Sequence, residues 1–543
     1  MIGAPPNLRV ADHIPAHPER EEWDVLVVGT GMGGSTLGCE LARRGRRVLF
    51  LEKGSVQHGN PLPEEPGPDG HSVAEIRLRT GRWPVPLEGR TSFGKTRFFA
   101  PMGCGSGGST ALFGAQLERF APADFRPRAN HPDVAGANLP EQWPISYQEL
   151  VPYYRRAEAL HRVCGTPDPL NPDPEAPLRE PPPLSDRDRV LHDSLVDLGL
   201  HPYRSHVGYH HIPECHECFD VCGKDCKGDA GGRSLVPALT RHGAGILPRC
   251  EALELVADRT RVHAVRARRN GTELRVGAKI VVLGAGAFMT PALLLNSRSA
   301  AWPDGLANRS GLVGRNLMLH TSDFVTIDHA DVHSAVGPRK SLALNDFYFD
   351  QGRKLGTLQS VGLPMVPSII LSYLRYVEEK DPRWWRRPVS RLLPPVARFA
   401  SHHFRRAAVF ATVVEDLPYR ENRVLPDPAA SNGMRYEYAY PPELRERNRH
   451  FRRRLAQRLA PRHKVTVVTG GANNINYGHV CGTCRFGEEP STSVLDPTNR
   501  AHGIDNLYVV DASFFPSSGG INPSLTIAAN ALRVAEVIHS ALP

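Results

Sequence analysis

A glycine-rich turn near the start of the chain has the residue types and spacing of a dinucleotide-binding site. Residues 29–34 read GTGMGG. In this pattern the first glycine permits a tight strand-to-helix turn, the second lets the backbone approach a pyrophosphate, and the third lets the helix pack closely on the strand. We therefore predict that Gly29, Gly31 and Gly34 hold a pyrophosphate at a helix N-terminus, where N–H groups and the helix dipole favour an anion. Glu52, at the end of the next predicted strand, would accept hydrogen bonds from the ribose hydroxyls.

A second group of residues that could take part in chemistry is a cluster of cysteines. Four of the ten cysteines lie within 215–226, namely Cys215, Cys218, Cys222 and Cys226. Four thiolates with spacers of two and three residues can converge on one zinc ion or on an iron–sulfur cluster. The same spacing is compatible with a structural loop of thiols or a disulfide, so the sequence leaves a metal site and a metal-free role open.

The glycine turn lies inside a βαβ unit. An apolar run at 24–28 precedes it, a segment with helical periodicity extends to Gly45, and a second apolar run follows at 47–51. Short continuous apolar runs are typical of buried parallel strands. Similar runs at 279–283 and 506–510 predict that distant segments complete the same sheet. A nicotinamide domain usually completes its sheet in one stretch, so this arrangement favours a flavin.

The sequence predicts two structural parts. Residues 20–150, 235–320 and 475–543 are expected to form a discontinuous α/β Rossmann-like domain that binds FAD. Residues 151–234 and 321–474 are expected to form an α+β substrate domain that contains the cysteine-rich segment. Part of this second region alternates apolar and polar residues, as at 408–414, which indicates an antiparallel sheet.

Composition narrows the class of protein. The chain has 543 residues, with 41% hydrophobic and 23% charged residues, which is ordinary for globular proteins and excludes disordered and collagen-like classes. The net charge of +9 would suit nucleic acid, but the basic residues are 57 Arg and only 9 Lys, an excess typical of genome composition rather than of one binding patch. We predict no nucleic-acid partner.

The sequence shows no targeting or membrane-spanning segment. The N-terminus has no apolar signal region, and no apolar run approaches the roughly 20 residues that a transmembrane helix needs. We therefore expect a cytoplasmic protein without a transmembrane segment.

Four separated blocks resemble the glucose-methanol-choline (GMC) oxidoreductases, which are FAD-dependent alcohol oxidases and dehydrogenases. They are the N-terminal fingerprint, the loop GCGSGGST at 103–110, the segment 286–297 and the C-terminal block 476–538. The stretch GLVGRNL at 311–317 is also similar to the family. The resemblance implies that FAD is held, beyond the fingerprint, by Gly103, Gly107, Gly108, Ser109, Thr110, Asp511, Ala512, Asn522 and Pro523.

The resemblance also implies the reacting residues. His479 in HVCGTCR matches the family's catalytic histidine, and Asn522 stands where members carry a partner His or Asn. Alcohol oxidation requires removal of the hydroxyl proton while a hydride leaves the carbon for the flavin N5. A histidine, whose ordinary pKa of about 6.5 lies near working pH, suits the role of base. Asn522 would orient the alcohol oxygen. Cys481 and Cys484 are expected to pack under this site rather than to bind metal.

Two positions depart from the family pattern. Leu112 stands where members with covalently attached FAD carry a histidine, which implies non-covalent FAD. Phe113 stands where members often have an asparagine, so one usual polar contact to the flavin is in doubt.

The expected substrate is a small-molecule alcohol, most naturally a sugar, glycoside or polyol, and one specific candidate is the 6′-hydroxyl of an aminoglycoside precursor. Glu415 and Asp416 are candidate partners for a cationic amine, or a solvated turn. The electron acceptor, oxygen or a redox partner, is left open. Alternatives are a redox-silent lyase of the hydroxynitrile lyase type and a sugar dehydrogenase that relays electrons through an iron–sulfur cluster. The Arg- and aromatic-rich segment 375–406 is expected to be a surface insertion or lid rather than a membrane contact.

Overall fold

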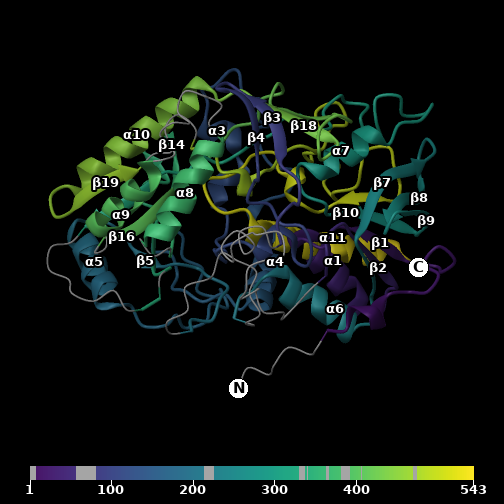
Figure 1. Cartoon of the computed structure of the whole chain (residues 1–543), viewed down its shortest axis with the longest axis horizontal. Helices are drawn as coiled ribbons and strands as arrows, with labels where there is room; N and C mark the ends of the chain where they lie inside the picture. Colours follow the sequence, from purple (N-terminus) through teal and green to yellow (C-terminus); the bar gives the residue numbers. More distant parts are fainter. Residues whose placement is uncertain are drawn as a thin grey trace.

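The computed structural model describes residues 8–56, 81–212, 226–328, 337–338, 340–362, 366–380, 392–404, 407–468 and 474–543. A five-stranded parallel sheet lies in one half of the molecule (Figure 1). Its order is β20-β10-β1-β2-β6. The four apolar runs expected to be strands all lie in this sheet, while β6 was not expected. The strands are β1 (Val25–Val28), β2 (Val48–Glu52), β6 (Gly245–Pro248), β10 (Ile280–Leu283) and β20 (Leu507–Val509).

Strand β1 is central because both of its edges are paired. Val25 lies opposite Val48 of β2 on one side and Ile280 of β10 on the other. All side chains of β1, β2 and β10 are buried, because helices and loops cover both faces of a parallel sheet. The helix after β1, α1 (Met32–Arg43), packs against the C-terminal helix α11 (Ser524–Ala541).

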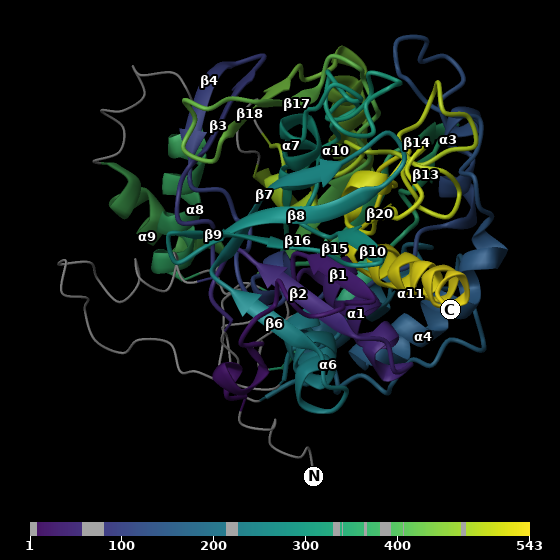
Figure 2. The ribbon, with the colours of Figure 1, turned by 90° about the vertical axis from the view of Figure 1, so that its right-hand side faces the viewer.

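The second half of the molecule, on the left in Figure 1 and behind the parallel sheet in the view of Figure 2, is built on a six-stranded antiparallel sheet. Its order is β19-β11-β16-β15-β12-β5. The segment 408–414, predicted to be an antiparallel strand, is β16. The fold class is therefore confirmed. The strands are β5 (Tyr203–Arg204), β11 (Phe324–Asp328), β12 (Leu342–Leu344), β15 (Gly356–Ser360), β16 (Ala408–Val414) and β19 (Lys464–Val468).

Smaller sheets join segments that are distant in the sequence. In the four-stranded sheet, β3 pairs with β4 on one side and, in parallel, with β18 from far downstream on the other. The boundaries proposed for the two domains remain a prediction. These strands are β3 (Leu87–Thr91), β4 (Gly94–Phe98), β17 (Arg423–Pro426) and β18 (Met434–Tyr438); a three-stranded sheet of β7 (Cys250–Ala257), β8 (Val262–Arg269) and β9 (Thr272–Val276); and the pair β13 (Phe349–Asp350) and β14 (Arg353–Lys354).

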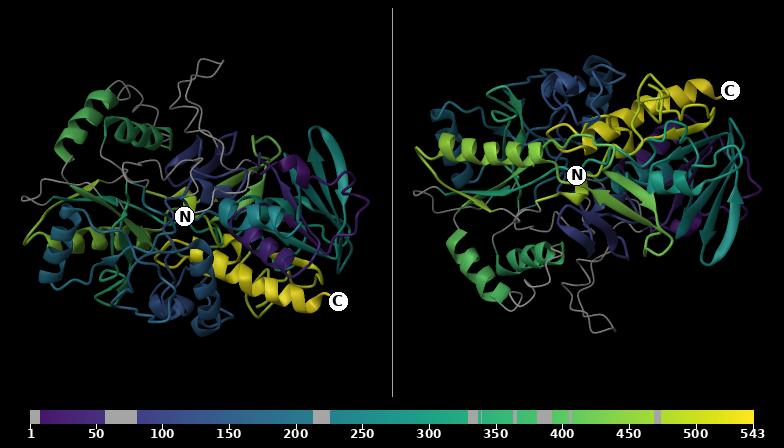
Figure 3. Two further views of the ribbon diagram at one scale, coloured as in Figure 1. Left: turned by 90° about the horizontal axis from the view of Figure 1, so that it is seen from below. Right: turned by 90° about the horizontal axis from the view of Figure 1, so that it is seen from above.

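The remaining helices connect and cover these sheets. Helices α8 and α9 form a hairpin at the outer edge of the molecule (Figure 3). None of the helices that the structure describes is long and apolar enough to cross a membrane. They are α3 (Pro127–Asn130), α4 (Tyr147–His161), α5 (Asp186–Asp197), α6 (Val236–Thr240), α7 (Met289–Asn296), α8 (Pro367–Lys380), α9 (Leu393–Phe404) and α10 (Pro442–Leu459), with short turns of helix η1 (Val10–His13), η2 (Gly108–Ala111), η3 (Pro122–Phe125), η4 (Gly231–Leu235), η6 (Tyr477–His479) and η7 (Ala512–Phe514).

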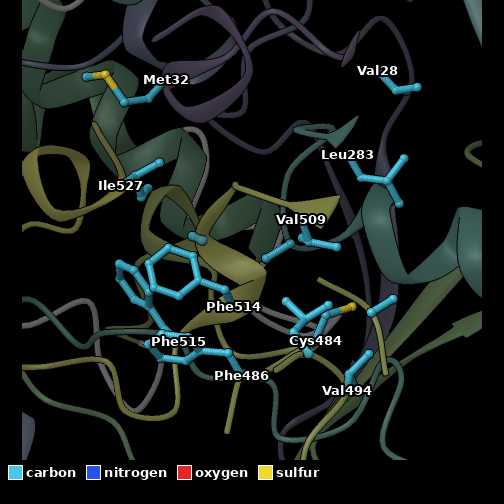
Figure 4. Close-up of a cluster of buried hydrophobic side chains, with 14 of the residues drawn as sticks. Val28, Met32, Leu283, Cys484, Phe486, Val494, Val509, Phe514, Phe515 and Ile527 are labelled. Atoms are coloured by element: carbon cyan, nitrogen blue, oxygen red, sulfur yellow. The ribbon is translucent and has the colours of Figure 1, made fainter. Parts of the chain in front are cut away.

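The largest hydrophobic cluster lies between the parallel sheet and the C-terminal block (Figure 4). Phe514 and Phe515, after β20, pack edge to face with ring centroids 4.5 Å apart. Cys484 is fully buried in this cluster, and so is Cys481. The prediction that both thiols serve as packing groups is confirmed. Their burial matters for the site because they directly follow His479 and fix the path of its loop.

Candidate active site

The fingerprint turn is one that only glycine permits. Gly29 has a φ of +96°, and a Cβ there would lie 2.5 Å from the carbonyl oxygen of Gly284. A Cβ on Gly34 would lie 2.2 Å from the oxygen of Gly29. Gly31 is the N-cap residue of α1 and can supply no side-chain cap of its own. The start of this helix therefore fits an anionic ligand group such as a pyrophosphate.

The second glycine loop, 103–110, lies directly on the first. Gly107 and Gly108 have φ of +76° and +53°, and a Cβ on Gly108 would lie 3.0 Å from the Cα of Gly31. The side chains of the loop brace it: Ser109 Oγ accepts from the N–H of Gly103 at 3.1 Å, and Thr110 Oγ1 donates to the Gly107 carbonyl at 2.6 Å. Together the two loops leave a backbone-lined cradle that side chains would fill, and this fits a flavin dinucleotide.

Glu52 joins these loops. Its carboxylate accepts hydrogen bonds from the N–H and hydroxyl of Thr30, and from the N–H groups of Gly54 and Gly105. Burial raises the pKa of Glu52, while these four donors oppose that effect. Contact between Glu52 and a ribose remains a prediction. What the structure adds is that this carboxylate sets the spacing between the two glycine loops.

Asp511, at the end of β20, also joins segments that are distant in the sequence. One carboxylate oxygen accepts from the Gly286 N–H at 2.9 Å and from the Thr290 hydroxyl at 2.5 Å. The other accepts from the N–H and hydroxyl of Ser513 and so begins the short helix Ala512–Phe514. Asp511 thus ties two of the family-like blocks together. Asn522 and Pro523 lie at the start of α11, where Pro523 is the N-cap residue.

The structure brings His479 and Asn522 together. His479 Nε2 lies 3.4 Å from Asn522 Nδ2. On the other side of the ring, His479 Nδ1 lies 3.0 Å from Nδ1 of His320, and the two rings are perpendicular. The side-chain oxygen of Asn522 is buried and has no hydrogen-bond partner within the described residues, so it is available to a ligand at this point.

His320 determines which nitrogen of His479 carries a proton. The Nε2 of His320 lies 2.9 Å from the Gly519 carbonyl and 3.2 Å from that of Ser518, so this nitrogen must be the donor. Burial lowers the pKa of His320 to about 4, so at neutral pH its Nδ1 has a lone pair. We assign the 3.0 Å contact as a bond donated by His479 Nδ1–H, because it is shorter than the 3.4 Å contact between the same nitrogen and Asn476 Nδ2. The lone pair of His479 is then on Nε2, on the side of Asn522.

The environment of His479 also keeps it uncharged. Burial, followed by the nearby His320 and Lys340, holds its pKa well below the ordinary value of 6.5. Sequence reasoning missed His320. It is one of 24 histidines and stands three residues beyond the family-like stretch 311–317, so no local pattern distinguished it. Only the fold, which places Met318 beside Cys481, brings the two histidines into contact.

Glu415 and Asp416 are not amine-binding residues and do not form a solvated turn, because both are completely buried. Glu415 is paired with Lys354 at 2.9 Å and with His131 at 2.8 Å. Asp416 accepts from the Leu319 N–H and the Tyr438 hydroxyl. Both expectations about this pair were therefore wrong. The sequence alone did not reveal that Lys354, on a different strand, is the buried partner of Glu415.

The cysteine cluster lies largely outside the described residues, which include only Cys226 of its four members. Among the residues that the structure does describe, no group of three or more His, Cys, Asp or Glu side chains could hold a metal ion. A metal at 215–226 therefore stays a prediction.

A cavity of about 450 Å³ reaches Ile521, the residue before Asn522. Five of its twenty lining residues are acidic, and two of these, Glu158 and Asp173, are paired with Arg119. Glu118 also lines it, where it accepts from the Tyr203 hydroxyl and lies 3.5 Å from His206 Nδ1. Asp168 lines it too and is not paired with an Arg or Lys within the described part of the chain. The acidic lining residues are Glu118, Glu158, Asp168, Asp173 and Asp346.

The parallel sheet, its glycine cradle and the antiparallel sheet define a flavin-dependent oxidoreductase. Models of the GMC oxidoreductase family match residues 23–322 and 427–531. The chain belongs to this FAD-dependent family, which acts on CH–OH donors.

Similar proteins cover nearly the whole chain. The 6'''-hydroxyparomomycin C oxidase of Streptomyces lividus is 30% identical, over 96% of this chain and 92% of its own length. The paromamine 6'-oxidase of Streptomyces fradiae is 30% identical, over 95% and 91%. Among solved structures, pyridoxine 4-oxidase from Mesorbium loti has a TM-score of 0.64 at 19% identity and covers 95% of this chain and 99% of its own; this likeness concerns the fold.

Proposed function

We propose that this protein oxidises a primary or secondary alcohol to a carbonyl compound, with His479 as the base. The observation that supports this most directly is the tautomer of His479. Its Nδ1–H is committed to His320, and its Nε2 lone pair lies beside the amide of Asn522. A general base must be neutral and within hydrogen-bond reach of the proton that it removes.

In the proposed reaction, FAD supplies the acceptor for a hydride. His479 Nε2 takes the hydroxyl proton of the alcohol as the carbon–oxygen double bond forms and the C–H bond breaks with its electron pair. The amide of Asn522 orients the alcohol oxygen toward His479. His320, held by the carbonyls of Ser518 and Gly519, keeps the imidazole from rotating and stabilises the imidazolium that forms.

The proposed substrate is a sugar, glycoside or polyol, including the 6′-hydroxyl of an aminoglycoside precursor. The names of the two Streptomyces relatives support this class. Asp168, a buried carboxylate without a Lys or Arg partner in the described chain, lines the cavity at Ile521 and favours a substrate that carries amines. The test is turnover of paromamine, glucose and sorbitol with an artificial electron acceptor. Faster turnover of paromamine than of the neutral sugars is expected, and equal rates would contradict the amine preference.

The pH dependence follows from the lowered pKa values. A histidine with a lowered pKa stays neutral, and so remains a base, down to lower pH than an ordinary histidine does. We expect kcat/KM for a non-ionising alcohol to be flat from about pH 8 down to about pH 5 and to fall only as pH approaches the His320 pKa of about 4. A pH profile with an acid limb centred at or above 6.5 would contradict this electrostatic account.

Substitution of His320 tests its role as a positioning residue. His320→Ala should retain FAD but lower kcat by about 10- to 100-fold, because His479 can then adopt the wrong tautomer. The acid limb should also move toward 6.5, since part of the burial that lowers the pKa of His479 is removed. His450 is likewise buried but lies on α10, paired with Asp350. A His450→Ala variant should keep the wild-type limb, and equal effects of the two substitutions would rule out a specific role for His320.

A further inference from the structure

The hairpin of α8 and α9 has an inner face that is fixed to the body of the molecule. Tyr373 and Tyr376 of α8 pack edge to face on Phe324 and Phe98, with ring centroids 4.9 and 5.9 Å apart. Ala397 of α9 is 1% exposed, as expected for a residue between two packed helices. Figures 2 and 3 show the hairpin at the outer edge, with α9 outside α8.

The other side of α9 is apolar and exposed. Leu392, Val396 and Phe399 are 59%, 48% and 73% exposed. Their spacing of four and three residues places them on one helix face, which we call the α9 outer face. Single exposed apolar residues are normal on protein surfaces, but a contiguous helical stripe marks an interaction site. The other large exposed hydrophobic residues of the described chain are Leu170, Val196, Phe349 and Val366.

The sequence on either side of α9 is rich in arginine, which indicates what this face contacts. The sequence 381–406 contains seven arginines and one acidic residue, Asp381, as well as Trp384 and Trp385. In α9 itself Arg398 is exposed beside Phe399. Arginine with Trp, Phe and Leu on an amphipathic helix is the combination that inserts its apolar side into a headgroup layer and attracts anionic lipid.

The sequence favoured a surface insertion or lid over a membrane contact for 375–406. Because the structure exposes these three apolar side chains together, we propose instead that the α9 outer face docks on the surface of an anionic lipid bilayer. Leu392, Val396 and Phe399 enter the headgroup region, and Arg398, which is exposed on the same helix, contacts a lipid phosphate. The contact is with the surface, since no described helix could cross the membrane.

Docking would bring the candidate active site close to the bilayer. At the end of α8, Lys380 Nζ donates to the Ile475 carbonyl at 3.4 Å and lies 5.9 Å from the ring centre of Tyr477. Tyr477 begins the short helix that ends at His479. Membrane binding and alcohol oxidation are nevertheless separable properties, and the first can be measured without the second.

The test is cosedimentation of the FAD-loaded protein with vesicles. We expect binding to phosphatidylcholine vesicles that contain about 30% phosphatidylglycerol, and binding weaker by about tenfold to phosphatidylcholine alone. Val396→Asp should weaken binding to the anionic vesicles by about tenfold or more. Val196→Asp is a matched control: Val196 lies on α5 and is 50% exposed, so it accepts the same charge on a different helix and should leave binding unchanged. Phe399→Ser should also weaken binding without adding charge.

Three results would overturn the proposal. One is failure of the wild-type protein to bind anionic vesicles. The second is an equal effect of Val396→Asp and Val196→Asp. The third is a change in oligomeric state on gel filtration for Val396→Asp with no change in vesicle binding, which would assign the face to a second copy of the chain. Flavin absorbance and the melting temperature of each variant report whether it is folded.

Discussion

Replacing His479 with alanine is expected to slow reduction of the flavin by an alcohol by about 10²- to 10⁴-fold. The side chain is the only candidate base whose lone pair lies beside Asn522 in the described site. FAD should remain bound, since the glycine loops that form its cradle are distant in sequence and are not altered. The rate is measured by rapid anaerobic mixing of the variant with substrate.

A suitable control for His479→Ala is rescue by added imidazole, which can enter the space left by the ring. Partial recovery of the rate would show that the lost group is a base rather than a structural support. A variant that reduces its flavin at the wild-type rate would contradict the assigned role of His479.

The second large effect is expected from Lys354→Met. Lys354 is fully buried between the carboxylates of Asp124, at 2.5 Å, and Glu415, at 2.9 Å. Its removal would leave two carboxylates in the core without their cation, and breaking a buried pair in this way costs about 3–5 kcal/mol. We expect a large fall in melting temperature and in the free energy of unfolding.

The matched control for Lys354→Met is Lys279→Met. Lys279 forms an ion pair of 2.8 Å with Asp24, but its side chain is 49% exposed. Loss of an exposed pair costs about 0–1 kcal/mol. Similar destabilisation by the two substitutions would show that the Lys354 cluster is not a special determinant of stability.

The Lys354 cluster also supports the active site. Tyr348 donates its hydroxyl hydrogen to Asp124 at 2.7 Å and accepts from the N–H of Gly520 at 2.8 Å. Gly520 lies two residues before Asn522, and the carbonyl of the preceding Gly519 holds His320. The buried charges therefore fix the loop that contains Gly519 and Gly520. This loop positions both partners of His479, which are His320 and Asn522. Lys354→Met should accordingly lower kcat in whatever fraction stays folded.

The sequence was most informative where local patterns carry the structure. Continuous apolar runs identified β1, β2, β10 and β20. A strand that is buried on both faces has apolar side chains at successive positions, and this pattern is visible in the sequence. Strand β6 was missed because Gly245 and Pro248 leave it only two large apolar residues, Ile246 and Leu247. The glycine turn could also be predicted from local sequence, because a side chain at Gly29 or Gly34 would collide with nearby backbone atoms.

Long-range contacts account for what the sequence did not reveal. His320 and His479 are 159 residues apart, and Lys354 reaches carboxylates from segments on either side of it. Glu415 and Asp416 looked like surface charges because charged residues are rarely buried unless paired, and the partner of Glu415 could not be identified before the strands were aligned. Tertiary pairing, rather than any local motif, decided both cases.

The most direct test of the central claim is the absorption spectrum of the FAD-loaded protein, mixed without oxygen with paromamine and, separately, with sugar alcohols. We predict that at least one alcohol bleaches the oxidised flavin band, that an aldehyde or ketone forms in equal amount, and that His479→Ala suppresses both. A flavin that stays oxidised with every alcohol, while the protein cleaves or forms a carbon–carbon bond of a hydroxynitrile, would contradict it and assign a redox-silent lyase to this scaffold.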